Sequence, residues 1–240
     1  MKNLFFRVWV AFAACMLAVS VVGCEEETDG GNEDVWSVES KNLVTRYVFP
    51  EEMSVRHEYD SSKVLFYVGT KGLAVGHRLE ARSEFENLEE DELSRRARLF
   101  DSMAVVYKDT SYKGKVPITG YWALAYPIDS ISIVSSSDYD MNHPAGTNLS
   151  DVVSIESYSF GACVLSGYLE KKVGIGVGFD MKVSELTREN RTLLCAQYGS
   201  LYNTGYFSIP QTSNPQVCQL TVTYLFSNGL KLSASTQVKL

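Results

Sequence analysis

Residues 217–240 read VCQLTVTYLFSNGLKLSASTQVKL, and apolar side chains alternate along both halves of this stretch. Such alternation predicts two β-strands, each with one buried face. A three-residue loop, residues 227–229, pairs Phe226 with Leu230 and Tyr224 with Leu232, so that both apolar faces lie on one side. A two-residue loop would put them on opposite sides. The stretch therefore predicts a β-hairpin in which Gly229 takes a left-handed conformation.

Short segments rich in β-branched and aromatic residues recur through the rest of the chain, and turn residues separate most of them. This pattern is typical of sandwiches and barrels. We therefore expect an all-β fold, an immunoglobulin-like β-sandwich, over residues 43–240; an alternative divides this region into two subdomains that separate near residues 128–150. The expected strands are 43–49, 63–68, 103–108, 121–126, 128–135, 152–160, 173–183, 217–226 and 230–240.

One segment has the sequence pattern of a helix. Asn87-Leu-Glu-Glu90 has the form of a helix capping box, and Arg95, Arg96 and Arg98 follow where cations favour the helix dipole. We expect one short helix over residues 88–99, covering one end of the sheets.

In the expected strand 173–183, alternate glycines including Gly178 leave one strand face bare for close packing inside the protein.

Composition limits the classes of partner. The chain has 240 residues, with 22 Lys and Arg against 29 Asp and Glu, a formal net charge of −7, and no block of Lys or Arg. Binding to nucleic acid needs a basic face that displaces counterions from the phosphates. The composition therefore argues against a nucleic-acid partner.

The N-terminus has the pattern of a signal peptide. A basic start, residues 1–7, precedes an apolar segment, residues 8–23, that is shorter than the roughly 20 residues of a membrane span. The segment ends in Val21-Val-Gly-Cys24, which resembles the lipobox of bacterial lipoproteins. The resemblance implies a cleaved leader over residues 1–23 and a lipid on Cys24. Cys15 is a competing site, and an uncleaved anchor or an ordinary secretory signal is the alternative.

An acidic run follows Cys24 directly. Residues 25–34 contain six acids and no base, so the run repels itself and cannot bury a core. We expect residues 24–42 to form a disordered, lipidated tether. Without the leader the chain has 20 basic and 29 acidic residues, a net charge of −9. Acids in this position resemble the export signal of Bacteroidetes-type surface lipoproteins, which implies an outer-membrane protein on the cell surface; the periplasmic face is the alternative.

One loop has a partial metal-binding pattern. Asp138, Asp140 and Asn142 repeat the opening of a calcium loop, in which alternate oxygens converge on a cation. His143 stands where such loops have glycine, and Leu149 stands where they have the closing glutamate. We therefore favour an ordinary turn-rich loop and keep a metal held by Asp138, Asp140, Asn142 and His143 as the alternative.

Motifs for catalysis are missing from the sequence. The chain has no nucleophile elbow, no His-Glu-x-x-His motif and no Cys-x-x-Cys pair. Of the cysteines that follow the tether, Cys163, Cys195 and Cys218, the last lies on the apolar face of its strand, as a small buried hydrophobic residue would. We expect no catalytic residue and no cofactor; a carbohydrate-active hydrolase with an unrecognised carboxylate pair is the alternative.

Residues 131–151 and 230–240 are similar to segments of uncharacterised Bacteroidetes-type lipoproteins. Asp101-Ser102-Met103 and Asp129-Ser130-Ile131 also resemble O-glycosylation sites of exported proteins of this type, which implies modification at Ser102 and Ser130. The resemblance implies compartment and fold, and no activity. We therefore expect a lipid-anchored, non-enzymatic binding or structural module that contacts the membrane and a glycan or envelope-protein partner; a fimbrial or adhesin subunit, or an accessory protein, is the alternative.

Overall fold

The structure is a computed structural model that describes residues 37–59, 63–76, 88–117, 119–169, 177–196, 202–213 and 215–240. Within these residues, eleven β-strands form three sheets, and only three α-helices and one 3-10 turn, Val183–Glu185, accompany them. This content agrees with the all-β class that the alternating sequence predicts.

The largest sheet has six strands in the order β5-β2-β3-β9-β7-β8. Its pairs are antiparallel except β2 with β5, which run parallel. The second sheet has three antiparallel strands in the order β11-β10-β6, and a small sheet pairs β1 with β4. The strands are β1 (Ser37–Ser40), β2 (Arg46–Tyr59), β3 (Lys63–Gly76), β4 (Gly114–Pro117), β5 (Trp122–Leu124), β6 (Ile128–Ser135), β7 (Ser154–Ser159), β8 (Val177–Lys182), β9 (Tyr202–Pro210), β10 (Val217–Phe226) and β11 (Lys231–Lys239).

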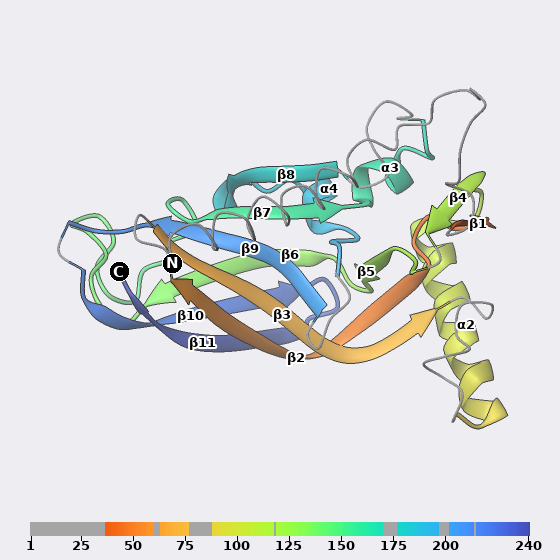
Figure 1. Ribbon diagram of the computed structural model, residues 1–240, viewed down its shortest axis with the longest axis horizontal. Coiled ribbons are helices and arrows are strands. Elements are labelled where there is room, and N and C mark those ends of the chain that lie inside the picture. The colour runs from red at the N-terminus through yellow and green to blue at the C-terminus, as the bar shows by residue number, and fades with distance from the viewer. Residues whose placement is uncertain are drawn as a thin grey trace, which may run out of the picture.

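One hydrophobic core joins the two larger sheets (Figure 1). Val48 and Phe66 of the six-stranded sheet belong to the same buried cluster as Ile133, Val222 and Tyr224 of the three-stranded sheet. Because β6 pairs with β10, the chain on both sides of residues 128–150 contributes to this core. The core therefore comes from the period-two alternation of apolar residues along both sheets.

A second core lies at the end of the molecule that carries helix α2 (Glu90–Tyr107) and the short helix α3 (Gly161–Leu165) (Figure 1). At the start of β2, Val48 belongs to the core between the sheets, and its neighbour Tyr47 belongs to the second core. Successive residues of a strand point to opposite faces, so this end of the six-stranded sheet is covered on both sides. Tyr47 packs there against the rings of Phe100 and Tyr107.

The expected helix is longer than predicted and is not the only one. It begins at Glu90 and ends at Tyr107, and a further short helix, α4 (Arg188–Arg191), occurs in the described chain. The strand expected over residues 103–108 is therefore wrong. Phe100, Ala104 and Tyr107 lie one turn apart and are buried together, so tertiary packing overrides the β-branched composition of the last turn.

The predicted ends of this helix are also corrected. Its N-cap is Glu89, which makes no side-chain capping bond, and Asn87 lies outside the described residues. The last turn contains no basic residue, because the helix continues to Tyr107; Arg95 and Arg96 therefore lie near its start, where they bind Glu92 of the first turn. Lys108 ends the helix in a left-handed conformation with φ 60°.

The expected tether over residues 24–42 is too long at its C-terminal end. Residues 37–40 form β1, and Val38 pairs with Val116 of β4. Residues 24–36 lie outside the described residues. The strands β1, β4 and β9 are absent from the predicted set, and β2 and β3 extend well beyond the predicted segments.

The C-terminal hairpin forms in the predicted register. Tyr224 lies opposite Leu232, and Gly229 takes a φ of 84°. The strands β6 and β10 also have their predicted bounds. On β8, Gly178 lies opposite Tyr158, and an added Cβ would lie 3.0 Å from a carbon of the Tyr158 ring, so this ring occupies the space beside the glycine; Gly178 itself is exposed to solvent and not packed inside the protein as predicted. Gly174 and Gly176 lie outside the described residues.

A buried carboxylate organises the α2 end. Asp109 follows α2, is fully buried, and accepts hydrogen bonds from the main-chain amides of Leu43 (2.7 Å) and Val44 (2.8 Å). The Tyr168 hydroxyl also donates to Asp109, at 2.5 Å. The Asn42 side chain donates to the main-chain oxygen of Asp109. We call this set the Asp109 hub; it ties α2, the segment before β2 and the segment after α3 to one side chain.

The hub combines opposing electrostatic effects. Burial raises the pKa of the Asp109 carboxyl above its usual range, although the Tyr168 hydroxyl and the two amides counteract this shift. Burial and the nearby Asp109 charge both raise the pKa of the Tyr47 phenol, so this phenol stays neutral. Tyr168 adopts a left-handed conformation with φ 64°, which non-glycine residues rarely take. Its hydrogen bond to Asp109 holds it there.

We expect Asp109→Ala to destabilise the protein by roughly 2–6 kcal/mol, because two buried amides lose their acceptor and each such loss costs about 1–3 kcal/mol. Asp109→Asn keeps one acceptor oxygen and should cost less. The exposed Asp101 of α2 is the matched control, and Asp101→Ala should stay within about 0.5 kcal/mol of wild type. Urea denaturation gives the three values, and equal stability of Asp109→Ala and Asp101→Ala would contradict this role.

Candidate functional site

The loop between β6 and β7 contains the candidate metal ligands and covers the free edge of β6. The Leu149 amide donates to the Ile133 oxygen at 2.8 Å, and the Gly146 amide donates to the Ser135 oxygen at 2.9 Å. The Asn148 side chain accepts from the Ile133 amide at 3.0 Å. Because β6 is an edge strand, these bonds satisfy main-chain groups that would otherwise be open to another strand.

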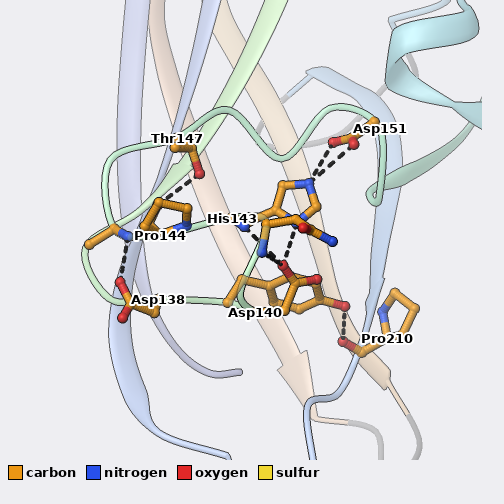
Figure 2. Close-up of polar contacts among 10 residues, drawn as sticks. Asp138, Asp140, His143, Pro144, Thr147, Asp151 and Pro210 are labelled. Carbon is orange, nitrogen blue, oxygen red and sulfur yellow. Dashed lines mark hydrogen bonds and ion pairs between the residues drawn. The ribbon is translucent and has the colours of Figure 1, made fainter.

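His143 lies at the centre of the loop between two carboxylates (Figure 2). Its Nδ1 atom is 2.7 Å from Asp140 Oδ1, and its Nε2 atom is 3.1 Å from Asp151 Oδ2. Asp140 Oδ1 also accepts the main-chain amides of Asn142 and His143, which closes a tight turn. The imidazole is 12% exposed, whereas both carboxylates are more open to solvent.

This arrangement favours the charged form of all three groups. The hydrogen bond with Asp140, and then the one with Asp151, raises the pKa of His143 above its usual value. Partial desolvation raises the pKa of Asp140, but hydrogen bonds from His143 and the main chain outweigh it and lower that pKa overall. The bond with His143 lowers the pKa of Asp151. The three groups therefore stabilise one another in their charged forms, an imidazolium between two carboxylates.

The four metal candidates do not converge on one point. Asp138 accepts the Ala145 amide at 2.7 Å and lies away from the pair of Asp140 and His143 (Figure 2). The Asn142 side chain is exposed. Leu149, at the position of the closing glutamate, is buried in the core. Within the described ranges, no group of three His, Cys, Asp or Glu side chains is placed to hold a metal ion.

The cluster also lacks the geometry of a catalytic triad. A triad histidine uses one ring nitrogen for its orienting carboxylate and the other for a nucleophile. Here both ring nitrogens of His143 are bound to carboxylates, so the ring holds the loop together. The pairing of Asp140 with His143 follows from their spacing, but Asp151 gave no signal in the sequence because only the folded loop brings it to Nε2.

The loop is also fixed to the six-stranded sheet. The Tyr139 hydroxyl donates to the Pro210 oxygen at the end of β9, at 3.0 Å, and the Tyr139 ring meets the His143 ring edge-on. The loop thus bridges the edge of one sheet and the end of the other. At each contact described, its side chains hold the loop in place.

The remaining predicted sites lie apart from this loop. Cys24 is outside the described residues. Ser102 is exposed on α2 and donates to the Arg98 oxygen at 2.7 Å, and Ser130 is exposed on β6 opposite Leu225. Cys163, Cys195 and Cys218 form no disulfide within the described residues. Burial raises the pKa of Cys195 to about 12, which suppresses its thiolate.

Comparison of the chain with family models, with curated proteins and with solved structures finds no match. None of the helices in the described part of the chain is long and apolar enough to cross a membrane.

We expect the His143 cluster to stabilise the protein most at mildly acidic pH. The folded pKa of His143 is raised, so its contribution is complete below the unfolded pKa of about 6.5 and is lost as pH rises through the folded value. The lowered pKa values of Asp140 and Asp151 make their contribution present above about pH 4 and lost as pH falls further. The window of greatest effect is therefore about pH 4 to 6.5.

Melting temperatures of wild type and His143→Gln test this window. The difference between them should be large at pH 6 and clearly smaller at pH 9. Asn142→Ala changes an exposed, non-titrating side chain of the same loop, so its difference from wild type should not vary with pH. A His143→Gln effect that grows from pH 6 to pH 9 would refute the ion-pair account.

Proposed function

We propose that this chain is a lipid-anchored protein of the bacterial cell envelope and acts as a non-enzymatic binding or structural module on the cell surface. The observation that carries the proposal is the N-terminal series of a basic start, an apolar segment, Gly23-Cys24 and six acids within residues 25–34. A diacylated Cys24 would hold the protein at the membrane, because each buried methylene adds about 0.8 kcal/mol.

The described residues support a non-enzymatic role. Both nitrogens of His143 are engaged by carboxylates, the Asp109 carboxylate is fully buried, and burial suppresses the Cys195 thiolate. Chemically versatile groups are thus used to hold the fold. The partner we propose is a glycan or another envelope protein, as expected for a binding module displayed on a tether.

For the fold, we propose an immunoglobulin-like sandwich of the two larger sheets. The shared core between these sheets and their mainly antiparallel pairing support it. The parallel pair β2–β5 and the helix α2 would be additions to that pattern.

Fatty-acid labelling in a gram-negative host tests the anchor. Wild type should incorporate the label and partition into detergent with the outer membrane. Cys24→Ala should take up no label and keep its leader, because lipoprotein processing needs the modified cysteine. Cys15→Ala is the matched control and should be labelled like wild type. Labelling that survives Cys24→Ala, or a wild type without label, would refute the assignment.

Protease added to intact cells distinguishes the two faces of the membrane. If the acidic run directs export, protease should release the body of the protein by cutting within residues 25–36. Protection of a labelled protein would instead place it on the periplasmic face.

A further inference from the structure

The α2 end of the molecule carries exposed apolar and cationic side chains together. We define the α2-end surface as Val105, Val106, Leu169, Lys41, Lys108 and Lys113. All six are exposed, and they come from three segments: the end of α2 with the residues that follow it, the residue after β1, and the residues after α3. Figure 1 shows β1, β4, α3 and the C-terminal end of α2 at the same end of the molecule.

The Asp109 hub brings these three segments together. Lys108 precedes Asp109, and the Lys108 amide donates to the Val105 oxygen at the end of α2. Leu169 follows Tyr168, whose hydroxyl donates to Asp109. The Lys41 oxygen accepts the Tyr112 amide, and Tyr112 packs on Tyr168 with ring centroids 5.5 Å apart. The surface therefore rests on a fixed scaffold of side chains.

The apolar side chains of this surface are open to solvent. Val105 is 67% exposed, Val106 69% and Leu169 83%. The two valines lie on the side of α2 opposite to Phe100, Ala104 and Tyr107, which face the second core. Adjacent exposed valines on a last helical turn add nothing to the folded core. A surface of this kind is typical of an interaction site.

The cationic part surrounds a shallow cleft. A cleft of about 460 Å³ is lined by Lys41, Lys113 and Lys115 together with Glu39, Ser40 and Tyr112. Lys41, Lys108 and Lys113 form no ion pair within the part of the chain that the structure describes. In a chain of net charge −7, this local excess of positive charge fits an anionic occupant.

The position of β1 indicates which anionic partner occupies this surface. The described structure begins at β1, at this same end, and Ser37 is only 13 residues from Cys24. Thirteen residues span at most about 45 Å. An anchor on Cys24 therefore keeps Ser37, and with it the α2 end, within about 45 Å of the bilayer. Apolar side chains flanked by lysines are the combination that favours an anionic lipid surface.

We propose that the α2-end surface docks on the anionic phospholipid headgroups of the membrane that holds the anchor, an inference that rests on the proposed lipid anchor. Val105, Val106 and Leu169 enter the headgroup region, and Lys41 and Lys113 of the cleft bind lipid phosphates. Docking orients the protein, so that the opposite end, with the C-terminus and the loop of His143, faces away from the membrane.

Vesicle sedimentation of residues 25–240 tests the proposal, since this chain lacks Cys24 and the leader but includes every described residue. It should bind vesicles of phosphatidylethanolamine and phosphatidylglycerol (3:1), and 0.5 M NaCl should weaken the binding. Val105→Gln with Val106→Gln should lower the partition coefficient about tenfold. Lys41→Gln with Lys113→Gln should remove most of the preference for these vesicles over phosphatidylcholine.

Val217→Gln is the matched control, because Val217 is 71% exposed and starts β10 at the end opposite to α2 (Figure 1). It should bind like wild type, and circular dichroism should confirm that every variant folds. Absence of binding, or equal loss in Val217→Gln, would overturn the proposal. A wild-type dimer that the double valine variant dissociates would also overturn it, by assigning the surface to a second copy. Fatty-acid labelling of the full chain tests the anchor separately, so failure of the anchor and failure of the surface are distinct results.

Discussion

The buried carboxylate of Asp109 is the constraint on which the α2 end of the protein depends. Two main-chain amides, those of Leu43 and Val44, are removed from water just before β2 begins, and Asp109 is their acceptor. The same carboxylate holds Tyr168. Without it, the segment before β2, the end of α2 and the segment after α3 would lose their common point of attachment. The charge and apolar side chains that these segments carry at the surface are therefore placed by one interior group.

Local pattern predicts the parts of this fold that have one buried and one exposed face. The strands β6 and β10 and the hairpin register follow from alternation, because a slip of one residue would expose a whole apolar row. The last turn of α2 contradicts its β-branched composition, since Phe100, Ala104 and Tyr107 gain more by packing under Tyr47 than a strand would offer. The strand β9 escaped prediction because Gly205 interrupts it, where an added Cβ would lie 3.1 Å from Ile155.

In the candidate sites, too, contacts between residues close in sequence could be predicted, and contacts that depend on the folded chain could not. Spacing links Asp140 to His143, but the second carboxylate, Asp151, and the diversion of Asp138 to the Ala145 amide depend on how the loop closes. The closed loop in turn protects the edge of β6. Asp109 carries no sequence signal, because its partners are main-chain amides 65 and 66 residues away. Interactions with main-chain groups leave no pattern of residue types to recognise.

Together, the N-terminal pattern and the α2-end surface give one account in which lipid and protein contacts meet the membrane at the same end of the molecule. Its central claim is the lipid on Cys24, and the intact mass of the protein purified in detergent from a gram-negative host tests it most directly. The account predicts the mass of residues 24–240 plus a diacylglyceryl group and an amide-linked acyl chain on the new N-terminus. A mass that retains Met1, or that begins at any residue other than Cys24 without added lipid, would contradict it.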